Sequence, residues 1–174
     1  LNLWVKKKIK LILVLSFISG GAPVVQAKVD MSNKQVNRIE KVFNGLRANN
    51  LEILDNFYSR NVSFIDPLGT HAGLESVKKY YGNLYENVKS IRFEFVDSIS
   101  QGDSHVVTWK MFLRTPSLNK GDEIILDGNS VIKFNEENLV SYHRDYFDMG
   151  EFIYENVPVL GWIISTIKEK MKVE

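Results

Sequence analysis

Apolar residues recur at helical spacing near the start of the chain and alternate with polar residues over most of its second half. The first stripe predicts a helix over residues 28–49, with Ser32 as its N-cap. The apolar positions of this stripe are Val36, Ile39, Val42, Phe43 and Leu46. A second short helix is predicted over 51–58 and a third over 74–84. Three helices therefore surround the first strand and precede the main run of strands.

The alternating segments predict five strands. A short strand over 61–66 ends at Pro67, after which Leu68–Gly69 turns the chain. Four further strands are expected over 91–99, 105–114, 123–134 and 139–147. Short turns join these four strands, so they should form an antiparallel sheet. Because the helices gather on one side, the predicted fold class is α+β: a curved antiparallel sheet wrapped around three helices into a cone-shaped barrel.

The last strand carries the residues best suited to chemistry. Alternation along 139–147 places Ser141, His143, Asp145 and Phe147 on one face. That face combines a base, a carboxylate and an aromatic wall. If it lines a cavity, the cavity has the groups needed for proton transfer. Concave, largely apolar cavities are also where small molecules bind.

The first 27 residues have the features of a secretory signal peptide. Lysines at four of positions 6–10 form a basic region, an apolar stretch follows over 11–18, and a cleavage pattern ends at Ala27. We expect cleavage after Ala27 and a periplasmic or secreted product. The alternative is an uncleaved N-terminal anchor, for which the apolar stretch is short.

Charge and composition narrow the possible partners. Cleavage after Ala27 removes four lysines and no acidic residue, which leaves 18 basic and 21 acidic residues and a net charge of −3. A chain with no basic excess is not expected to bind nucleic acid. The absence of cysteine excludes disulfides and thiolate metal sites. No histidine pair has the spacing of metal ligands, so we predict neither a metal nor a cofactor.

Four segments carry a resemblance to a known family. They span residues 47–51, 57–62, 64–69 and 73–81, and include Phe64-Ile65-Asp66-Pro67-Leu68-Gly69. Over about residues 34–148 the chain resembles the nuclear transport factor 2-like superfamily, and more narrowly the SnoaL-like polyketide cyclases and ketosteroid isomerases. The resemblance implies one domain over 28–148, followed by an extension over 149–174.

The resemblance also implies roles for single residues. Asp66 stands where the isomerases have their catalytic base, before Pro-x-Gly. The positions of the isomerases' oxyanion tyrosine and aspartate fall at Val42 and near Ser130, so both acids are missing. Steroid isomerisation by that mechanism is therefore not expected. Asp145 matches the late-strand aspartate that acts as acid and base in the cyclases.

Each candidate has a plainer interpretation. Asp66 also suits a turn before Pro67. Asp145 and His143 also suit a buried hydrogen-bonded pair that only holds the strand. His71, in the loop after Asp66, either reaches the mouth of the cavity or is solvated. The expected pocket wall comprises Trp109, Phe147, Phe93 and Val42.

The C-terminal extension has a broad apolar face. We expect a helix that packs across the open end of the cone or onto a second copy in a homodimer, with Asp148 as its N-cap. The alternative is contact with a membrane surface through 150–172, because Trp162 and the terminal lysines suit an interface.

Three functions remain open at this level. The first is binding of a hydrophobic small molecule, such as a lipid, terpenoid or polyketide-like compound. The second is a cofactor-independent isomerase, cyclase or hydratase in which Asp66 or Asp145 shuttles a proton with help from His143. The third is a non-catalytic interaction protein whose cone is filled by its own side chains. Fold alone does not decide among them.

Overall fold

The computed structural model describes residues 34–172 of the 174-residue chain. The predicted signal peptide and Ser32 lie outside the described residues. The helical segments are α1 (Lys34–Gly45), η1 (Leu51–Asn56), α2 (Leu74–Tyr85), η2 (Asn119–Gly121), α3 (Met149–Phe152), η3 (Tyr154–Asn156) and α4 (Pro158–Met171). The strands are β1 (Tyr58–Asp66), β2 (Gly69–Ala72), β3 (Ser90–Gln101), β4 (Ser104–Arg114), β5 (Ile124–Phe134) and β6 (Val140–Phe147).

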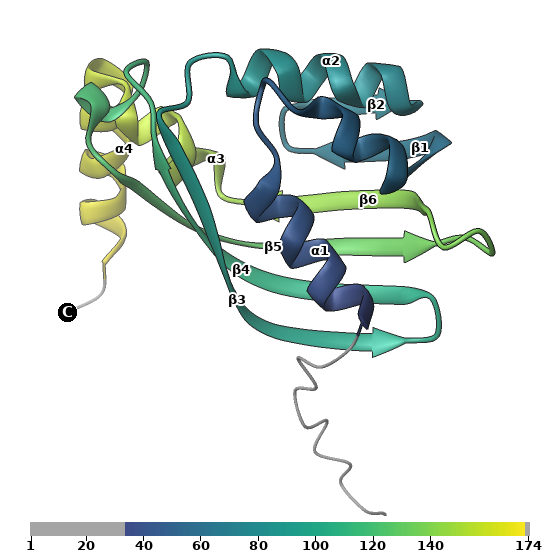
Figure 1. Cartoon of the computed structure of the whole chain (residues 1–174). Coiled ribbons are helices and arrows are strands. Elements are labelled where there is room, and N and C mark those ends of the chain that lie inside the picture. The colour runs from purple at the N-terminus through teal and green to yellow at the C-terminus, as the bar shows by residue number, and fades with distance from the viewer. Residues whose placement is uncertain (1–33, 173–174) are drawn as a thin grey trace, which may run out of the picture.

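The strands form one curved sheet in the order β2-β1-β6-β5-β4-β3. Neighbouring strands are antiparallel except β1 and β6, which run parallel with Ser63 opposite Tyr142. The sheet does not close, and β2 and β3 are its edges. Helix α1 packs against β3, and α2 runs along β1 and β2 (Figure 1). This architecture confirms the predicted α+β fold with a curved sheet over helices.

Helix α1 ends four residues before the predicted stop at Asn49. Its apolar stripe is buried as expected. The side chain of Asn50 accepts a hydrogen bond from the Arg47 backbone N–H (2.6 Å) and donates one to the Gly45 carbonyl (2.8 Å). Asn50 thus satisfies a carbonyl that the helix leaves free at its C-terminal end, which stabilises the earlier stop.

Two predictions about the region after α1 were wrong. The second helix is a 3-10 helix that ends at Asn56, so Tyr58 begins a strand that starts three residues earlier than predicted. A short strand, β2, pairs back onto β1 where only a turn was expected. The four hairpin-linked strands are antiparallel as predicted, and the sequence pattern had not indicated the parallel partner of the first strand, β6. The four residues of β2 have no apolar alternation, so backbone hydrogen bonds alone identify them as a strand.

The C-terminal extension divides into two parts. Asp148 caps α3, as predicted, because its Oδ1 accepts hydrogen bonds from the backbone N–H groups of Gly150 (2.5 Å) and Glu151 (3.3 Å). Phe152 of α3 is buried and packs edge-on against Phe147 at a ring distance of 5.5 Å. Helix α4 instead contacts η3 and extends away from the sheet (Figure 1). The prediction that it packs across the open end was wrong, since α3 occupies that place.

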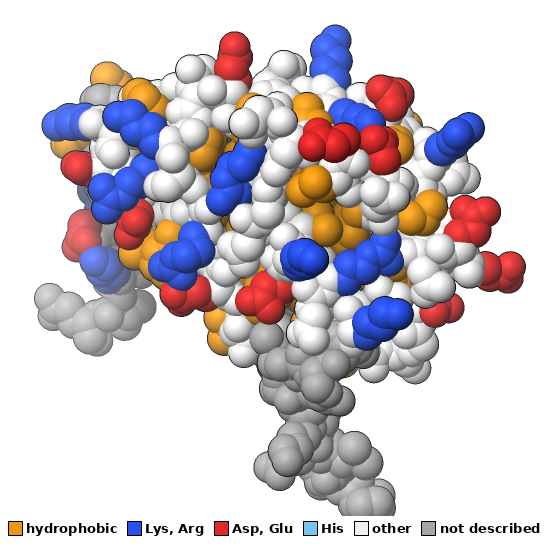
Figure 2. Space-filling model, in the orientation of Figure 1, with side chains coloured by type: hydrophobic (Ala, Val, Ile, Leu, Met, Phe, Trp, Pro, Cys, Tyr) orange, Lys and Arg blue, Asp and Glu red, His pale blue; other side chains and the backbone are white. Residues whose placement is uncertain are grey.

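Two surface properties concern possible partners. Basic and acidic side chains are interspersed over the face shown in Figure 2, which gives that face no patch of a single sign. Across residues 34–172, no helix combines the length and the apolar character needed to cross a bilayer.

Candidate functional site

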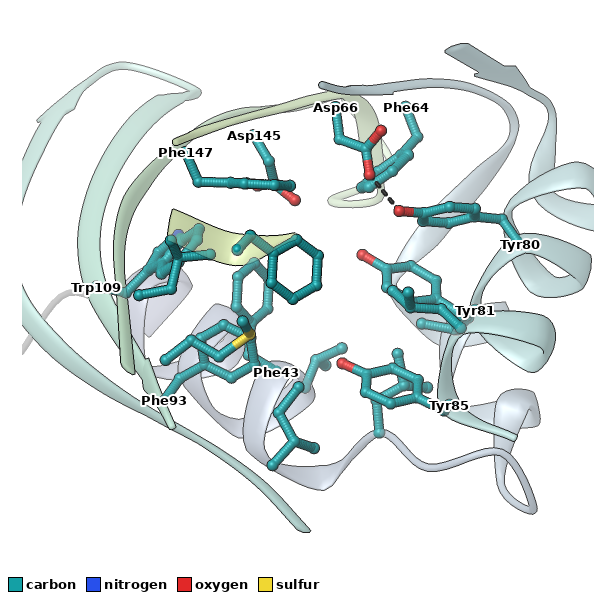
Figure 3. A pocket seen from close by; sticks show the side chains of 18 of the residues that line it. Phe43, Phe64, Asp66, Tyr80, Tyr81, Tyr85, Phe93, Trp109, Asp145 and Phe147 are labelled. Atoms are coloured by element: carbon teal, nitrogen blue, oxygen red, sulfur yellow. Dashed lines mark hydrogen bonds between the residues drawn. The ribbon is translucent and has the colours of Figure 1, made fainter. Parts of the chain in front are cut away.

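A cavity lies between the concave face of the sheet and helices α1 and α2 (Figure 3). Its volume is about 70 Å³, measured as the space open to the centre of a water molecule. Most of its wall is apolar and aromatic. The lining residues are Val42, Phe43, Leu46, Leu54, Tyr58, Phe64, Asp66, Tyr80, Tyr81, Leu84, Tyr85, Ile91, Phe93, Trp109, Met111, Leu126, Asp145, Phe147 and Phe152.

Asp145 lines this cavity at the centre of a chain of hydrogen bonds. Its Oδ1 lies 2.8 Å from Nε2 of His143 and accepts the hydroxyl of Ser130 at 2.5 Å. Ser130 in turn accepts the indole N–H of Trp109 at 2.9 Å. Within residues 34–172, no hydrogen bond reaches the other carboxylate oxygen, Oδ2. Asp145 is therefore held through one oxygen and can offer the other to a ligand.

His143 stands behind Asp145 and does not line the cavity. It is fully buried, with its ring stacked on Phe43 and Tyr58 and edge-on to Phe64. Its Nδ1 lies 2.5 Å from the Tyr58 hydroxyl. The two ring nitrogens of His143 thus join the Tyr58 hydroxyl to Oδ1 of Asp145. His143 is placed to orient Asp145 rather than to touch a ligand.

Asp66 lines the same cavity but all its described hydrogen bonds serve the fold. Its Oδ1 accepts the backbone N–H groups of Leu68 (2.8 Å) and Gly69 (2.9 Å), and its Oδ2 accepts the Tyr80 hydroxyl. These are the bonds of a turn former at the β1–β2 connection. A role for Asp66 in chemistry stays a prediction, and its carboxylate is less free than that of Asp145.

His71 lies on β2 and is not among the residues that line the cavity. Its ring stacks on Tyr80 at 4.1 Å and lies near Phe64 at 5.9 Å. Its buried Nε2 has no hydrogen-bond partner within the described chain. His71 therefore packs against Tyr80, whose hydroxyl donates a hydrogen bond to Asp66. It lies neither at the mouth of the cavity nor in bulk solvent, the two positions considered from the sequence.

The remaining predicted wall residues all face the cavity. Trp109 and Phe93 pack edge to face with ring centroids 5.4 Å apart, and Phe147 lies beside the indole at 6.4 Å. Val42 contributes from α1. The alternation of β3, β4 and β6 brings Phe93, Trp109 and Phe147 to the concave face, as the strand pattern indicated.

Four tyrosines that were not predicted from the sequence as site residues complete the wall. They are Tyr58, Tyr80, Tyr81 and Tyr85. Burial raises the pKa of each phenol, and the negative charge of Asp145 adds to the rise in each case. All four are therefore neutral hydroxyls at physiological pH. The spacing of Tyr81 and Tyr85, four residues apart on one helical face, was the available signal for two of them.

A second, wider cavity adjoins the first at its open end. It has a volume of about 230 Å³ on the same measure and shares five lining residues with the first. These shared residues are Leu84, Tyr85, Ile91, Met111 and Phe152. No charged side chain of the described residues lines this outer cavity. The two cavities are therefore neighbours with these five side chains between them.

The described residues show no grouping of three or more His, Cys, Asp or Glu side chains that would hold a metal ion. The polar groups of the cavity are carboxylates and phenols. Such an arrangement can accept a proton, donate a hydrogen bond, or balance a positive charge.

Comparisons with solved structures find the same fold. TerC, crystallised with polyporic acid, has a TM-score of 0.57 at 20% identity, over 67% of this chain and 93% of TerC. A ketosteroid isomerase-like protein from Catenulispora acidiphila, in complex with trimethylamine, has a TM-score of 0.61 at 10% identity, over 72% of this chain and 93% of that protein. A Shewanella putrefaciens protein, assigned by name to the SnoaL-like polyketide cyclases, has a TM-score of 0.60 at 14% identity, over 71% and 93%.

Sequence comparison identifies the family. No curated protein matches the chain significantly. A sequence profile of the SnoaL-like domain matches residues 39–143, which is more than half of the chain and includes the later part of α1, the first five strands and the start of β6. The predicted resemblance is thereby confirmed, and the chain belongs to the SnoaL-like domain family.

Proposed function

We propose that this protein binds a hydrophobic small molecule in the cavity beside Asp145. The proposal rests on one observation. Oδ2 of Asp145 has no hydrogen-bond partner among the described residues, and the cavity wall around it is mostly aromatic and aliphatic. Two proteins of the same fold were crystallised with small molecules, polyporic acid and trimethylamine, which supports a ligand-binding use of the fold. Because a cavity remains, we do not carry forward the alternative of a cone filled by its own side chains.

A second candidate is a cofactor-independent isomerase, cyclase or hydratase. For an isomerisation, Oδ2 of Asp145 would take a proton from one substrate carbon and return it to another, which leaves no net change in protons. For a hydration, Oδ2 would take a proton from a water molecule that adds its oxygen to one carbon of a double bond, and would deliver that proton to the other carbon. His143 and Ser130 would hold the carboxylate in place through Oδ1. The position of Asp145 favours this candidate, and the absence of the two oxyanion acids expected for a steroid isomerase weighs against that one reaction.

A thermal-shift screen with apolar ligands tests both candidates. A ligand that binds only the folded state raises the melting temperature. We expect shifts for wild type that persist in Asp66→Asn, because the described bonds of Asp66 serve the turn. If the shift also persists in Asp145→Asn and no product forms, the protein is a binder. If wild type converts the ligand and Asp145→Asn binds it without conversion, the protein is an enzyme. No shift with any ligand would overturn the proposal.

Location and assembly are further parts of the proposal. We propose export to the periplasm or beyond, on the strength of the N-terminal sequence pattern. We also propose that α4 lies on a membrane surface, because it exposes large apolar side chains and ends in three lysines. These side chains are Val159, Leu160, Trp162, Ile163, Ile167 and Met171. A homodimer formed through α4 is the competing outcome.

A further inference from the structure

The inner cavity is both aromatic and acidic. Ten of its nineteen lining side chains are aromatic, so π faces and edges surround most of the space (Figure 3). The two charged lining residues, Asp66 and Asp145, are both acidic, and no Lys, Arg or His of the described residues lines the space. Asp66 already accepts three hydrogen bonds. The free negative oxygen is therefore that of Asp145.

The described contacts of Asp145 all fall on one of its two carboxylate oxygens. Ser130 donates to Oδ1, and Nε2 of the fully buried His143 lies 2.8 Å from the same oxygen, so Oδ2 is left facing the cavity. The other facing groups are neutral phenols. Arg47, an exposed residue just after α1, acts electrostatically on Tyr85 but does not line the cavity.

From this balance we infer that the ligand is an organic cation, a hydrophobic amine whose ammonium group meets Asp145. The inference rests on the proposed binding function and names its ligand class. An ammonium N–H donates a charge-assisted hydrogen bond to Oδ2 of Asp145. Aromatic faces around the same space attract the remaining positive charge, most strongly where water is excluded.

The outer cavity accommodates the rest of such a ligand. It is lined mainly by apolar side chains, and none of the described residues in its lining is charged. An apolar substituent on the amine can extend past Tyr85 and Phe152 into this space, where burial of its surface is favourable. An amphipathic amine therefore fits the two cavities in one orientation, with the charged end inward.

The test compares two probes that have the same shape and differ in charge. N,N-dimethylbenzylamine is protonated at neutral pH, and isobutylbenzene is its uncharged carbon counterpart. Dissociation constants measured by calorimetry on the wild-type chain should favour the amine by about tenfold or more. Equal or tighter binding of isobutylbenzene would overturn the amine inference and leave the binding function intact. If neither probe binds, the proposed binding function fails, and the inference with it.

Two variants test whether Asp145 causes the preference for the amine over isobutylbenzene. Asp145→Asn should bring the two probes to within about twofold of each other. Asp127→Asn is the matched control, because Asp127 is a carboxylate on the outer face of β5, paired with Lys110. It should keep the preference for the amine. If Asp127→Asn abolishes the preference as well, the effect is a general one of net charge and the assignment to Asp145 is wrong. The wild-type comparison remains decisive even if Asp145→Asn does not fold.

Discussion

At the scale of single residues, Gly128 fixes the position of the indole that lines the cavity. A Cβ atom built on Gly128 would lie 2.2 Å from Cη2 of Trp109, because the ring lies across the backbone of β5. The Gly128→Ala variant must therefore move Trp109 and lengthen its bond to Ser130. We expect a loss of about 1–3 kcal/mol in the free energy of unfolding. Urea denaturation measures the loss, and the near-UV circular dichroism spectrum reports the moved indole.

Gly45→Ala is the control for this prediction. A Cβ at Gly45 meets only Ile53, at 4.0 Å, which is an ordinary contact distance. This substitution should change neither the near-UV spectrum nor the stability by a comparable amount. An unchanged spectrum and stability in Gly128→Ala would show that the indole does not lie over β5.

His105 makes a contribution to stability that depends on pH. Burial lowers its pKa from the ordinary value of 6.5, against the opposing attraction of Asp103. The unfolded chain takes up the proton near pH 6.5, and the folded protein takes it up only at lower pH. Between these two values the unfolded state binds more protons, so the free energy of unfolding falls as the pH falls through this range. Below the folded pKa this contribution no longer changes.

His105→Gln tests this dependence. Wild type should lose more stability between pH 7.5 and pH 5.5 than the variant, because glutamine does not titrate. Urea denaturation at both pH values gives the comparison. Ser100, whose hydroxyl lies 2.8 Å from Nδ1 of His105, can still bond the glutamine side chain. Equal losses in the two proteins would show that His105 titrates alike in the folded and unfolded states.

At the scale of elements, α4 contacts the rest of the domain mainly through η3. It packs on η3, and Trp162 and Met171 are 71% and 75% exposed. Removal of residues 158–174 should therefore leave the melting temperature within about 2 °C of wild type, since little apolar surface is exposed by the deletion. The same deletion should abolish co-sedimentation with anionic lipid vesicles. Phe152 must be retained because it is buried in the core.

Replacement of Lys168, Lys170 and Lys172 by glutamine separates the contribution of charge to membrane binding from the contribution of apolar contact. We expect weaker binding to anionic vesicles and no change with neutral vesicles. If the intact chain does not sediment with any vesicle, the membrane proposal fails. If light scattering shows a dimer that the deletion converts to a monomer, α4 is a dimerisation helix instead.

At the scale of the whole molecule, the proposed export would change both the mass and the charge of the protein. Cleavage after Ala27 would leave residues 28–174 with a net charge of −3 in place of +1. Intact mass spectrometry of the protein from a periplasmic fraction should give the mass of 28–174. The processed protein should bind an anion exchanger near neutral pH. Recovery of the full-length mass from the membrane fraction would instead support a retained anchor.

The candidate site was predictable to the extent that it depends on strand alternation. His143, Asp145 and Phe147 point to the concave side because successive residues of β6 face opposite ways. Trp109 and Phe93 follow the same rule on β4 and β3. The tyrosines of α2 were not identified, because an apolar helical face looks alike whether it packs tightly or borders a cavity. His71 was misplaced because β2 has no pattern of its own.

The sequence by itself determined the long strands with their inward faces, the helices α1 and α2, and the family. The elements follow from local periodicity, which a single segment contains, and the family follows from the short motifs that carry the resemblance. The tertiary structure alone decided the parallel pairing of β1 with β6, the chain of bonds from Tyr58 through His143 to Asp145, and the free face of α4. Each of these joins segments far apart in the chain, or depends on which side of an element is left uncovered. Neither property is encoded in the spacing of residues along one segment, because each results from how the segments pack together.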